Sequence, residues 1–346
     1  MSAVSLSRDT AAQAARRPIL EAAGITKRFV KRLDLAGKIA RRLGSSIHEE
    51  VVHAVDGVDL TVGAGEVVGL VGESGCGKST FGRMVAGILP PTEGTLAFDG
   101  KPVWRDGRVA SRETALAIQM IFQDPFASLD PRMRVEEIIG EAPLVHGMTT
   151  RGELADYVAD TMLRVGLDPD FRRRYPHQFS GGQRQRIGIA RALAVKPRFL
   201  VCDEAIAALD VSIQAQVINL FMDLRRDLDL TYLFISHDLS VVEHIADRVV
   251  IMYLGRVVEI AATEAIFDNP NHPYTQALLS EVPRIELRKR TYQPVKGEIP
   301  SPLDPPPGCH FHPRCPHASE RCRRERPVLK EIAGGRWSAC HLNDPS

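Results

Sequence analysis

The stretch G-E-S-G-C-G-K-S-T, residues 72–80, has the spacing of a loop that binds the phosphates of a nucleotide. Its glycines let successive backbone N–H groups turn toward phosphate oxygens, at a helix N-terminus whose positive potential attracts anions. Lys78 is expected to reach the β- and γ-phosphates, and the hydroxyl of Ser79 to bind Mg²⁺. We therefore predict nucleotide contacts for the whole loop, which consists of Gly72, Glu73, Ser74, Gly75, Cys76, Gly77, Lys78, Ser79 and Thr80.

Two adjacent acids end the apolar run F-L-V-C-D-E, residues 199–204. A carboxylate at the C-terminal end of a buried strand is well placed to hold Mg²⁺ through water, which is the role we predict for Asp203. Neighbouring strand residues point in opposite directions, so Glu204 is free to aim at an attacking water as a general base. A solvent-facing acidic strand end is the plain alternative, and the phosphate-binding loop elsewhere in the chain favours the catalytic interpretation.

A second glycine-containing helix start lies at F-S-G-G-Q, residues 179–183. Ser180 is a good N-cap residue, and the two glycines permit close approach of the backbone to an anion. This predicts a second anion-binding helix N-terminus. One nucleotide does not need two such sites on one chain. Two chains placed head to tail would each lend this segment to the other's nucleotide, so the sequence predicts a dimer.

The order of these motifs resembles that of ABC-transporter ATP-binding subunits, with Gln123 before, and Asp210 and His237 after, the S-G-G-Q stretch. Within them the chain is most similar to the peptide-importer class, the dipeptide and oligopeptide permease ATPases. The resemblance runs from about residue 20 to residue 340. It is carried by I-F-Q-D-P-F-A-S-L-D-P-R, A-L-D-V-S-I-Q-A-Q-V-I-N-L, N-P-N-H-P-Y-T-Q-A-L-L-S and G-E-I-P-S-P-L-D-P-P-P-G-C.

The resemblance implies roles for individual residues. Gln123 would sense Mg²⁺ and the attacking water, and His237 would contact the γ-phosphate beside Glu204. The implied catalytic set is Glu204, His237, Lys78 and Gln123, and the implied Mg²⁺ ligands are Ser79, Gln123 and Asp203. Outside the phosphate-binding loop, the implied ATP contacts are Phe29, Gln123, Ser180, Gly181, Gly182, Gln183, Asp203, Asp210 and His237.

Asp210 would lie at the dimer seam, whereas Phe29 falls where the family places an aromatic residue that stacks on adenine and equally fits a strand core. The family usually has D-E-P-T-S-A-L-D, and here the segment is D-E-A-I-A-A-L-D. Ala205 in place of proline loosens the turn after Glu204, which affects the expected rate rather than the reaction.

The elements that position these residues are those of an α/β fold. Continuous apolar runs alternate with helical patterns, which predicts a largely parallel sheet with helices on both sides. We expect a P-loop NTPase core over residues 19–124 and 196–268, with a helical subdomain at 125–195. Residues 1–18 are expected to be a disordered lead, and 269–346 a proline- and cysteine-rich C-terminal appendage with little regular structure.

The tail holds four of the six cysteines, Cys309, Cys315, Cys322 and Cys340. Cytosolic disulfides are disfavoured, so these thiols are expected to be reduced unless a metal holds them. Their wide spacing suits a four-thiolate iron–sulfur cluster, [4Fe-4S], better than the short pairs of structural zinc sites. A mixed zinc site with tail histidines and the absence of any metal are the alternatives.

Composition and the resemblance together define the expected setting. The net charge of +1 gives no global argument for nucleic acid, and no apolar run reaches the roughly 20 residues of a membrane span. The resemblance implies an ATPase at the cytoplasmic face of the inner membrane that drives import of di- or oligopeptides. Its partners would be a sister ATPase in a heterodimer, two permease chains and an extracytoplasmic substrate-binding protein. A nickel or small-solute importer, and a soluble ABC ATPase, are the alternatives.

Overall fold

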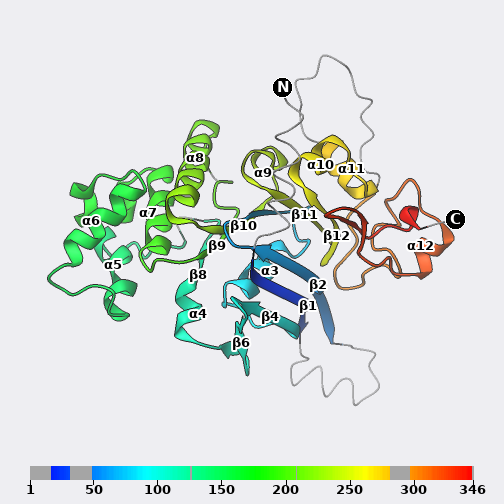
Figure 1. Ribbon diagram of the computed structural model, residues 1–346, viewed down its shortest axis with the longest axis horizontal. Coiled ribbons are helices and arrows are strands. Elements are labelled where there is room, and N and C mark those ends of the chain that lie inside the picture. Colours follow the sequence, from blue (N-terminus) through cyan, green and yellow to red (C-terminus); the bar gives the residue numbers. More distant parts are fainter. Residues whose placement is uncertain (1–16, 32–48, 125–126, 208, 281–296, 345–346) are drawn as a thin grey trace.

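The computed structural model describes residues 17–31, 49–124, 127–207, 209–280 and 297–344. Residues 1–16 of the expected lead at 1–18 lie outside it, and Pro18 is the first residue of β1. An eight-stranded sheet with the order β13-β14-β12-β11-β3-β10-β9-β8 forms the centre of the molecule (Figure 1). Its strands are β3 (Val67–Val71), β8 (Ile118–Ile121), β9 (Phe199–Asp203), β10 (Thr231–Ser236), β11 (Arg248–Tyr253), β12 (Arg256–Ala262), β13 (Lys330–Ala333) and β14 (Arg336–Ser338).

The central strands of this sheet confirm the predicted parallel α/β arrangement. β8, β9, β10, β3 and β11 are parallel to one another, and β12 runs antiparallel to β11. Every residue of β3, β9 and β10 is buried, as expected for apolar runs covered on both faces of a sheet. The carboxyl ends of these strands therefore meet at one edge, where the phosphate-binding loop and the two acids follow them.

A second, antiparallel sheet was not predicted. It has the order β2-β1-β4-β5, formed by β1 (Pro18–Lys31), β2 (Glu50–Gly63), β4 (Glu93–Phe98) and β5 (Lys101–Pro102). A buried cluster joins both sheets, with Leu20 and Val62 on one side and Leu70 and Leu233 on the other. A two-stranded ribbon, formed by β6 (Trp104–Arg105) and β7 (Arg108–Val109), contacts β4 of the antiparallel sheet.

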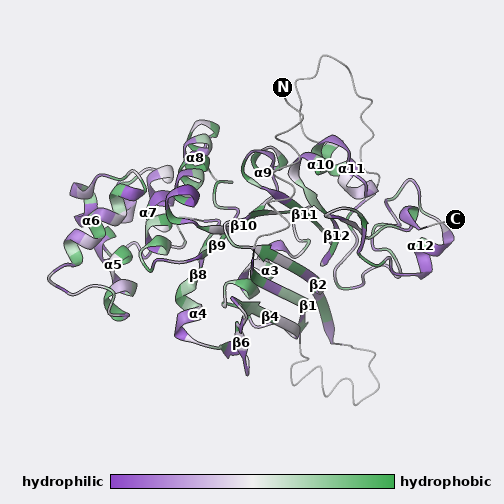
Figure 2. Ribbon diagram, in the orientation of Figure 1, coloured by the Kyte–Doolittle hydropathy of each residue, from purple (hydrophilic) through white to green (hydrophobic). Residues whose placement is uncertain are grey.

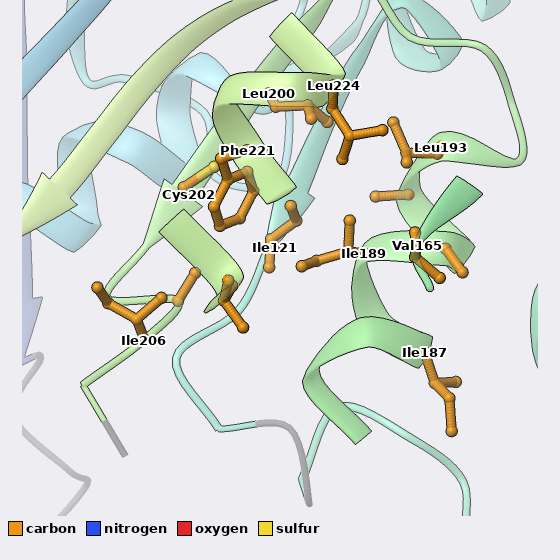
Figure 3. Close-up of a cluster of buried hydrophobic side chains, with 14 of the residues drawn as sticks. Ile121, Val165, Ile187, Ile189, Leu193, Leu200, Cys202, Ile206, Phe221 and Leu224 are labelled. Atoms are coloured by element: carbon orange, nitrogen blue, oxygen red, sulfur yellow. The ribbon is translucent and has the colours of Figure 1, made fainter. Parts of the chain in front are cut away.

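The predicted helices are present. The described residues contain α3 (Lys78–Val85), α4 (Arg112–Ala117), α5 (Val135–Val145), α6 (Leu154–Arg164), α7 (Gly181–Leu193), α8 (Val211–Leu228), α9 (Leu239–Ile245), α10 (Thr263–Asp268), α11 (Pro273–Ser280) and α12 (Glu320–Arg324). Figure 2 shows hydrophobic and hydrophilic residues on different parts of α5 to α8. Apolar residues of α7 and α8 pack against the sheet, as Leu193 of α7 and Phe221 of α8 do around Leu200 of β9 (Figure 3). Helices α5 and α6 pack on α7. None of the described helices is long and apolar enough to cross a bilayer.

The C-terminal segment has more regular structure than predicted. Glu259 and Ile260 of β12 pair with Ser338 and Trp337 of β14, and β13 pairs with β14 in turn. The segment therefore extends the central sheet. Strands of three and four residues are too short to show a clear alternation of apolar residues, which is why the sequence did not reveal them.

Candidate active site

The phosphate-binding loop joins β3 to α3, as predicted. Gly77 has φ +105° and is the N-cap of α3 without a side-chain hydrogen bond, so the first N–H groups of the helix point into the loop. A Cβ atom at Gly77 would collide with the carbonyl oxygen of Ala54 in β2, and one at Gly72 with that of Met252 in β11. Glycine is thus required at both positions by the approach of a neighbouring strand.

Lys78 lies in the interior of this loop. Its Nζ atom donates to the backbone oxygens of Gly72, at 2.6 Å, and Glu73, at 3.0 Å, and the residue is 4% exposed. A buried ammonium group enclosed by backbone carbonyls provides a positive charge where phosphates are expected. The backbone carbonyl of Cys76 accepts a hydrogen bond from Gly255 N–H, which ties the loop to the turn after β11. Burial raises the pKa of the Cys76 thiol.

Ser79 and Asp203 lie together at the edge of the sheet. The Ser79 hydroxyl donates to a carboxylate oxygen of Asp203 at 2.7 Å, across 124 residues of sequence. Burial raises the pKa of Asp203, and the hydrogen bond from Ser79 lowers it in part. A hydroxyl and a buried carboxylate held in contact are the oxygen donors that Mg²⁺ prefers.

Glu204 is the centre of a second group of polar side chains. Its Oε2 atom accepts from Nε2 of Gln123 at 2.7 Å and lies 3.4 Å from Nδ1 of His237. The backbone of Glu204 is left-handed, with φ +47°, which turns the residue out of the line of β9. Gln123 follows β8 and His237 follows β10, so three parallel strands deliver these side chains to one point.

The structure therefore brings six predicted residues to one edge of the sheet, namely Lys78, Ser79, Gln123, Asp203, Glu204 and His237. The arrangement combines a cradle for phosphate, a pair of oxygen donors for a divalent cation and a carboxylate aligned by two polar neighbours. These are the parts that hydrolysis of a nucleoside triphosphate requires.

The S-G-G-Q segment forms a helix start but lies elsewhere. The Ser180 side chain accepts from Gln183 N–H, and the Gln183 side chain accepts from Ser180 N–H, which caps α7. Gly182 approaches Ile213 of α8 so closely that a Cβ atom would meet its side chain. Figure 1 shows α7 in the helical region at one end of the long axis, away from α3 near the centre.

Two further predicted residues lie on the surface. Phe29 in β1 is 42% exposed with Lys27 Nζ 5.3 Å from its ring centre, so it is not part of a strand core. It belongs to the hairpin whose other strand contacts the phosphate-binding loop through Ala54. Asp210 is exposed at the N-terminus of α8, where its side chain forms no capping hydrogen bond, and the following Val211 is 83% exposed.

Two residues that contact the loop were missed by the sequence. Tyr274 of α11 accepts a hydrogen bond from Glu73 N–H at 2.9 Å through its hydroxyl oxygen. Arg314 of the C-terminal segment forms two hydrogen bonds of 2.8 Å to the Glu73 carboxylate. They are separated from Glu73 by 201 and 241 residues, and no local pattern signals such contacts.

The four tail cysteines are free thiols. The pKa of Cys309 is raised to about 11, mainly by burial and in smaller part by Cys322, Cys340 and Cys315. Within the described part of the chain, no group of three or more His, Cys, Asp or Glu side chains is arranged to hold a metal ion. The structure thus gives no support to the predicted iron–sulfur or zinc site.

Two family descriptions match different parts of the chain. Residues 55–207 match the family described as "ABC transporter", and residues 258–322 match "Oligopeptide/dipeptide transporter, C-terminal region". The first covers the phosphate-binding loop, the S-G-G-Q segment and the two acids. The second covers the segment that contains Tyr274 and Arg314.

Relatives and solved structures extend these matches. The chain is 50% identical to the oligopeptide transport ATP-binding protein AppF of Bacillus subtilis over 94% of this chain and 97% of that protein. It is 51% identical to the putative oligopeptide transport ATP-binding protein YkfD of the same organism, over 85% of this chain and 91% of that one.

Among solved structures, cbiO1 of Clostridium perfringens, part of an ABC transporter complex, has a TM-score of 0.58 at 26% identity, covering 73% of this chain and 91% of that one. The dimeric ATP-binding cassette MJ0796 bound to ADP and Pi has the same TM-score at 25% identity, covering 70% and 98%.

Proposed function

Because the chain belongs to the family of ABC transporter ATP-binding proteins, we propose that it hydrolyses ATP to drive the import of di- or oligopeptides. The observation that carries the proposal is the convergence of Ser79, Asp203, Gln123, Glu204 and His237 on the loop that holds Lys78. The match to the oligopeptide and dipeptide C-terminal region supports the peptide cargo.

The described oxygen donors fit the Mg²⁺ that accompanies ATP. Ser79 and Asp203 are already in contact, and Gln123 reaches the same edge of the sheet. Mg²⁺ bound there would neutralise charge on the β- and γ-phosphates. Lys78 would exchange its two carbonyl partners for phosphate oxygens, and the N–H groups of residues 74–79 would hold the remaining oxygens.

Glu204 is the residue to which we assign proton abstraction. The hydrogen bond from Gln123 and the neighbouring His237 fix its carboxylate at the end of β9, so that it can accept a proton from water attacking the γ-phosphate. His237, 56% exposed, is also free to donate to the γ-phosphate from its other ring nitrogen. We assign Phe29 to adenine on the basis of its exposure and its place on the hairpin over the loop.

We propose that two such chains enclose each ATP between them. Two observations support this. The capped N-terminus of α7 lies apart from the phosphate-binding loop of the same chain, and exposed Asp210 and Val211 are available for a partner. A related cassette is a dimer with ADP and Pi. The partner in this proposal is a similar but non-identical sister chain, as the resemblance to peptide-class ATPases implies.

We propose that a groove beside Gln123 receives the membrane partner. The groove has a volume of about 700 Å³ and is lined by residues that include Ile88, Phe122, Gln123, Ala127, Ser128 and Arg191. A segment bound there would move with Gln123, which links docking of a permease to the position of Glu204. The chain would then act at the cytoplasmic face of the inner membrane, with two permeases and a substrate-binding protein as partners.

The four tail cysteines are assigned as one functional group. The support is a backbone hydrogen bond of 2.9 Å from Cys309 N–H to the Cys322 carbonyl, which brings two of the four cysteines into contact. An iron–sulfur cluster is the first occupant to test, and zinc the second. The test is an absorbance spectrum of anaerobically purified chain with iron, sulfide and zinc assays, compared with a variant in which all four are serine. Protein without any of these elements would contradict the assignment.

The function is tested by recovering the tagged chain from gently solubilised membranes and identifying its partners by mass. We expect a sister ATPase, two permeases and a peptide-binding protein, with ATP hydrolysis in the recovered complex. Recovery with nucleic acid and without permeases would overturn the transport proposal. Recovery with permeases whose binding protein holds nickel or another small solute would overturn the peptide cargo alone.

A further inference from the structure

The C-terminal segment contacts the phosphate-binding loop through a buried ion pair. The two terminal nitrogens of Arg314 donate to the two carboxylate oxygens of Glu73, each at 2.8 Å. The side chains are 6% and 18% exposed. This parallel, two-bond geometry is the strongest that an arginine and a carboxylate form. It joins the tail to the second residue of the loop.

Aromatic residues hold both partners in place. Arg314 lies 5.8 Å from the ring centre of Tyr253 and 5.9 Å from that of Phe311. Tyr253, Tyr274 and Phe311 contact one another with centroid distances of 4.6 to 5.4 Å. The hydrogen bonds to Glu73 also raise the pKa of Arg314, so its charge is retained. The arginine therefore sits in a rigid environment built from β11, α11 and the tail.

The same residue of the loop is held at three atoms. Arg314 fixes the Glu73 carboxylate, the Tyr274 hydroxyl accepts from Glu73 N–H, and Lys78 donates to the Glu73 carbonyl. When phosphate binds, Lys78 is expected to leave this carbonyl, and the first two contacts then keep Glu73 in position. The neighbouring Ser74 and Gly75 are exposed and have no comparable anchor among the contacts described.

We propose that Arg314 is a positioning residue of the ATP site, which sets the affinity for nucleotide by holding the phosphate-binding loop through Glu73. The inference rests on the proposed ATPase function. It makes the C-terminal segment part of the nucleotide site, although Arg314 itself does not touch ATP. A loop held in its binding geometry before the nucleotide arrives loses less conformational freedom on binding, which favours affinity.

The test is titration of the full-length chain with a fluorescent ATP analogue and Mg²⁺, for the wild type and Arg314→Gln. We expect the Kd to rise by at least about tenfold, the factor that corresponds to losing one hydrogen bond to a charged group. Arg314→Lys keeps the charge but loses the two-bond geometry, so an intermediate Kd is expected. Turnover at saturating ATP should change little, which separates loop positioning from damage to Glu204.

The matched control is Arg321→Gln. Arg321 is in the same tail, and its two carboxylate partners, Glu325 and Asp344, both belong to the tail, so its loss should leave the Kd for ATP unchanged. Glu73→Gln provides an independent test should Arg314→Gln fail to fold. The double variant Glu73→Gln/Arg314→Gln should bind ATP no more weakly than Arg314→Gln, because both changes remove one interaction.

The outcomes distinguish the two proposals. If the wild type fails to bind Mg-ATP, the ATPase function is refuted. If the wild type binds and both Arg314→Gln and Glu73→Gln bind within about twofold of it, the ATPase function stands and the positioning role is refuted. Strictly additive effects of Glu73→Gln and Arg314→Gln would also refute it.

Discussion

Replacement of Glu204 by glutamine is the most direct test of the site. The substitution keeps the length and shape of the side chain. It also keeps one oxygen that can accept from Nε2 of Gln123, which in the wild type lies 2.7 Å from Oε2 of Glu204. It removes the negative charge and the ability to take a proton from water. The oxygen that lies 3.4 Å from Nδ1 of His237 loses its negative charge for the same reason. The fold should therefore persist, since Glu204 is at the rim of the site rather than in its core.

The expected loss can be worked out from this geometry. A positioned general base contributes about 10²- to 10⁴-fold to a rate, so turnover should fall by that factor. This corresponds to about 3–5 kcal/mol on the activation barrier. Binding of ATP depends on the loop around Lys78, which Glu204 does not contact in the described structure. The Kd for Mg-ATP should therefore stay within about twofold of the wild type, well below the change of a lost charged hydrogen bond.

Phosphate release by the complex recovered from membranes measures the rate, and nucleotide titration measures the affinity. Glu113→Gln is the matched control, because Glu113 is an exposed glutamate of α4 whose partner is Lys101 on the surface. Its turnover should equal that of the wild type. Turnover of Glu204→Gln within about tenfold of the wild type would show that another group takes the proton.

Three further perturbations give distinct results. Gly77→Ala should raise the Kd for ATP by about 10- to 100-fold in nucleotide titrations, because Gly77 has φ +105° and Ala54 leaves no room for a Cβ atom. The control Gly107→Ala, at a site with open space around the glycine, should leave the Kd unchanged. Burial raises the pKa of Asp203 above that of the unfolded chain, so the free energy of unfolding decreases as the pH rises from the unfolded pKa through the folded one. Asp203→Asn should therefore raise the Tm of the nucleotide-free chain at pH 7.5 by about 2 °C or more while abolishing stabilisation by Mg-ATP, and an unchanged Tm would contradict the cause given for the shift. Burial lowers the pKa of His272 from 6.5 to about 4. The contribution of this neutral ring to the free energy of unfolding is therefore complete above pH 6.5 and is lost as the pH falls, by about 2 kcal/mol between pH 7 and pH 5. Urea unfolding at the two pH values should show a smaller loss for His272→Gln, and an equal loss would refute the assignment.

The parts of the site that the sequence revealed have strong local patterns. Val67–Val71, Phe199–Asp203 and Thr231–Ser236 are continuous apolar runs, and parallel strands place their carboxyl ends at one edge. Each run is followed directly by predicted site residues. The contact of Glu204 with Gln123 and His237 follows from this topology, although the individual hydrogen bonds do not.

The parts that the sequence did not reveal depend on contacts between distant segments. β1 pairs with β2 and β4, and no pattern within a single strand shows which strands pair, so their separate antiparallel sheet was missed. The contact of Arg314 with Glu73 joins residues 241 positions apart, beside the packed ring of Tyr253. No periodicity within the tail encodes it.

The addition of β14 to the central sheet has a consequence for solubility. Without the tail, β12 would be an outermost strand whose unpaired backbone groups invite association with other chains. With the tail in place, the outermost strand is β13, only four residues long and bearing Lys330 and Glu331, which discourages such pairing. Shortening the chain before residue 330 would thus favour aggregation, even in a protein whose nucleotide site was intact.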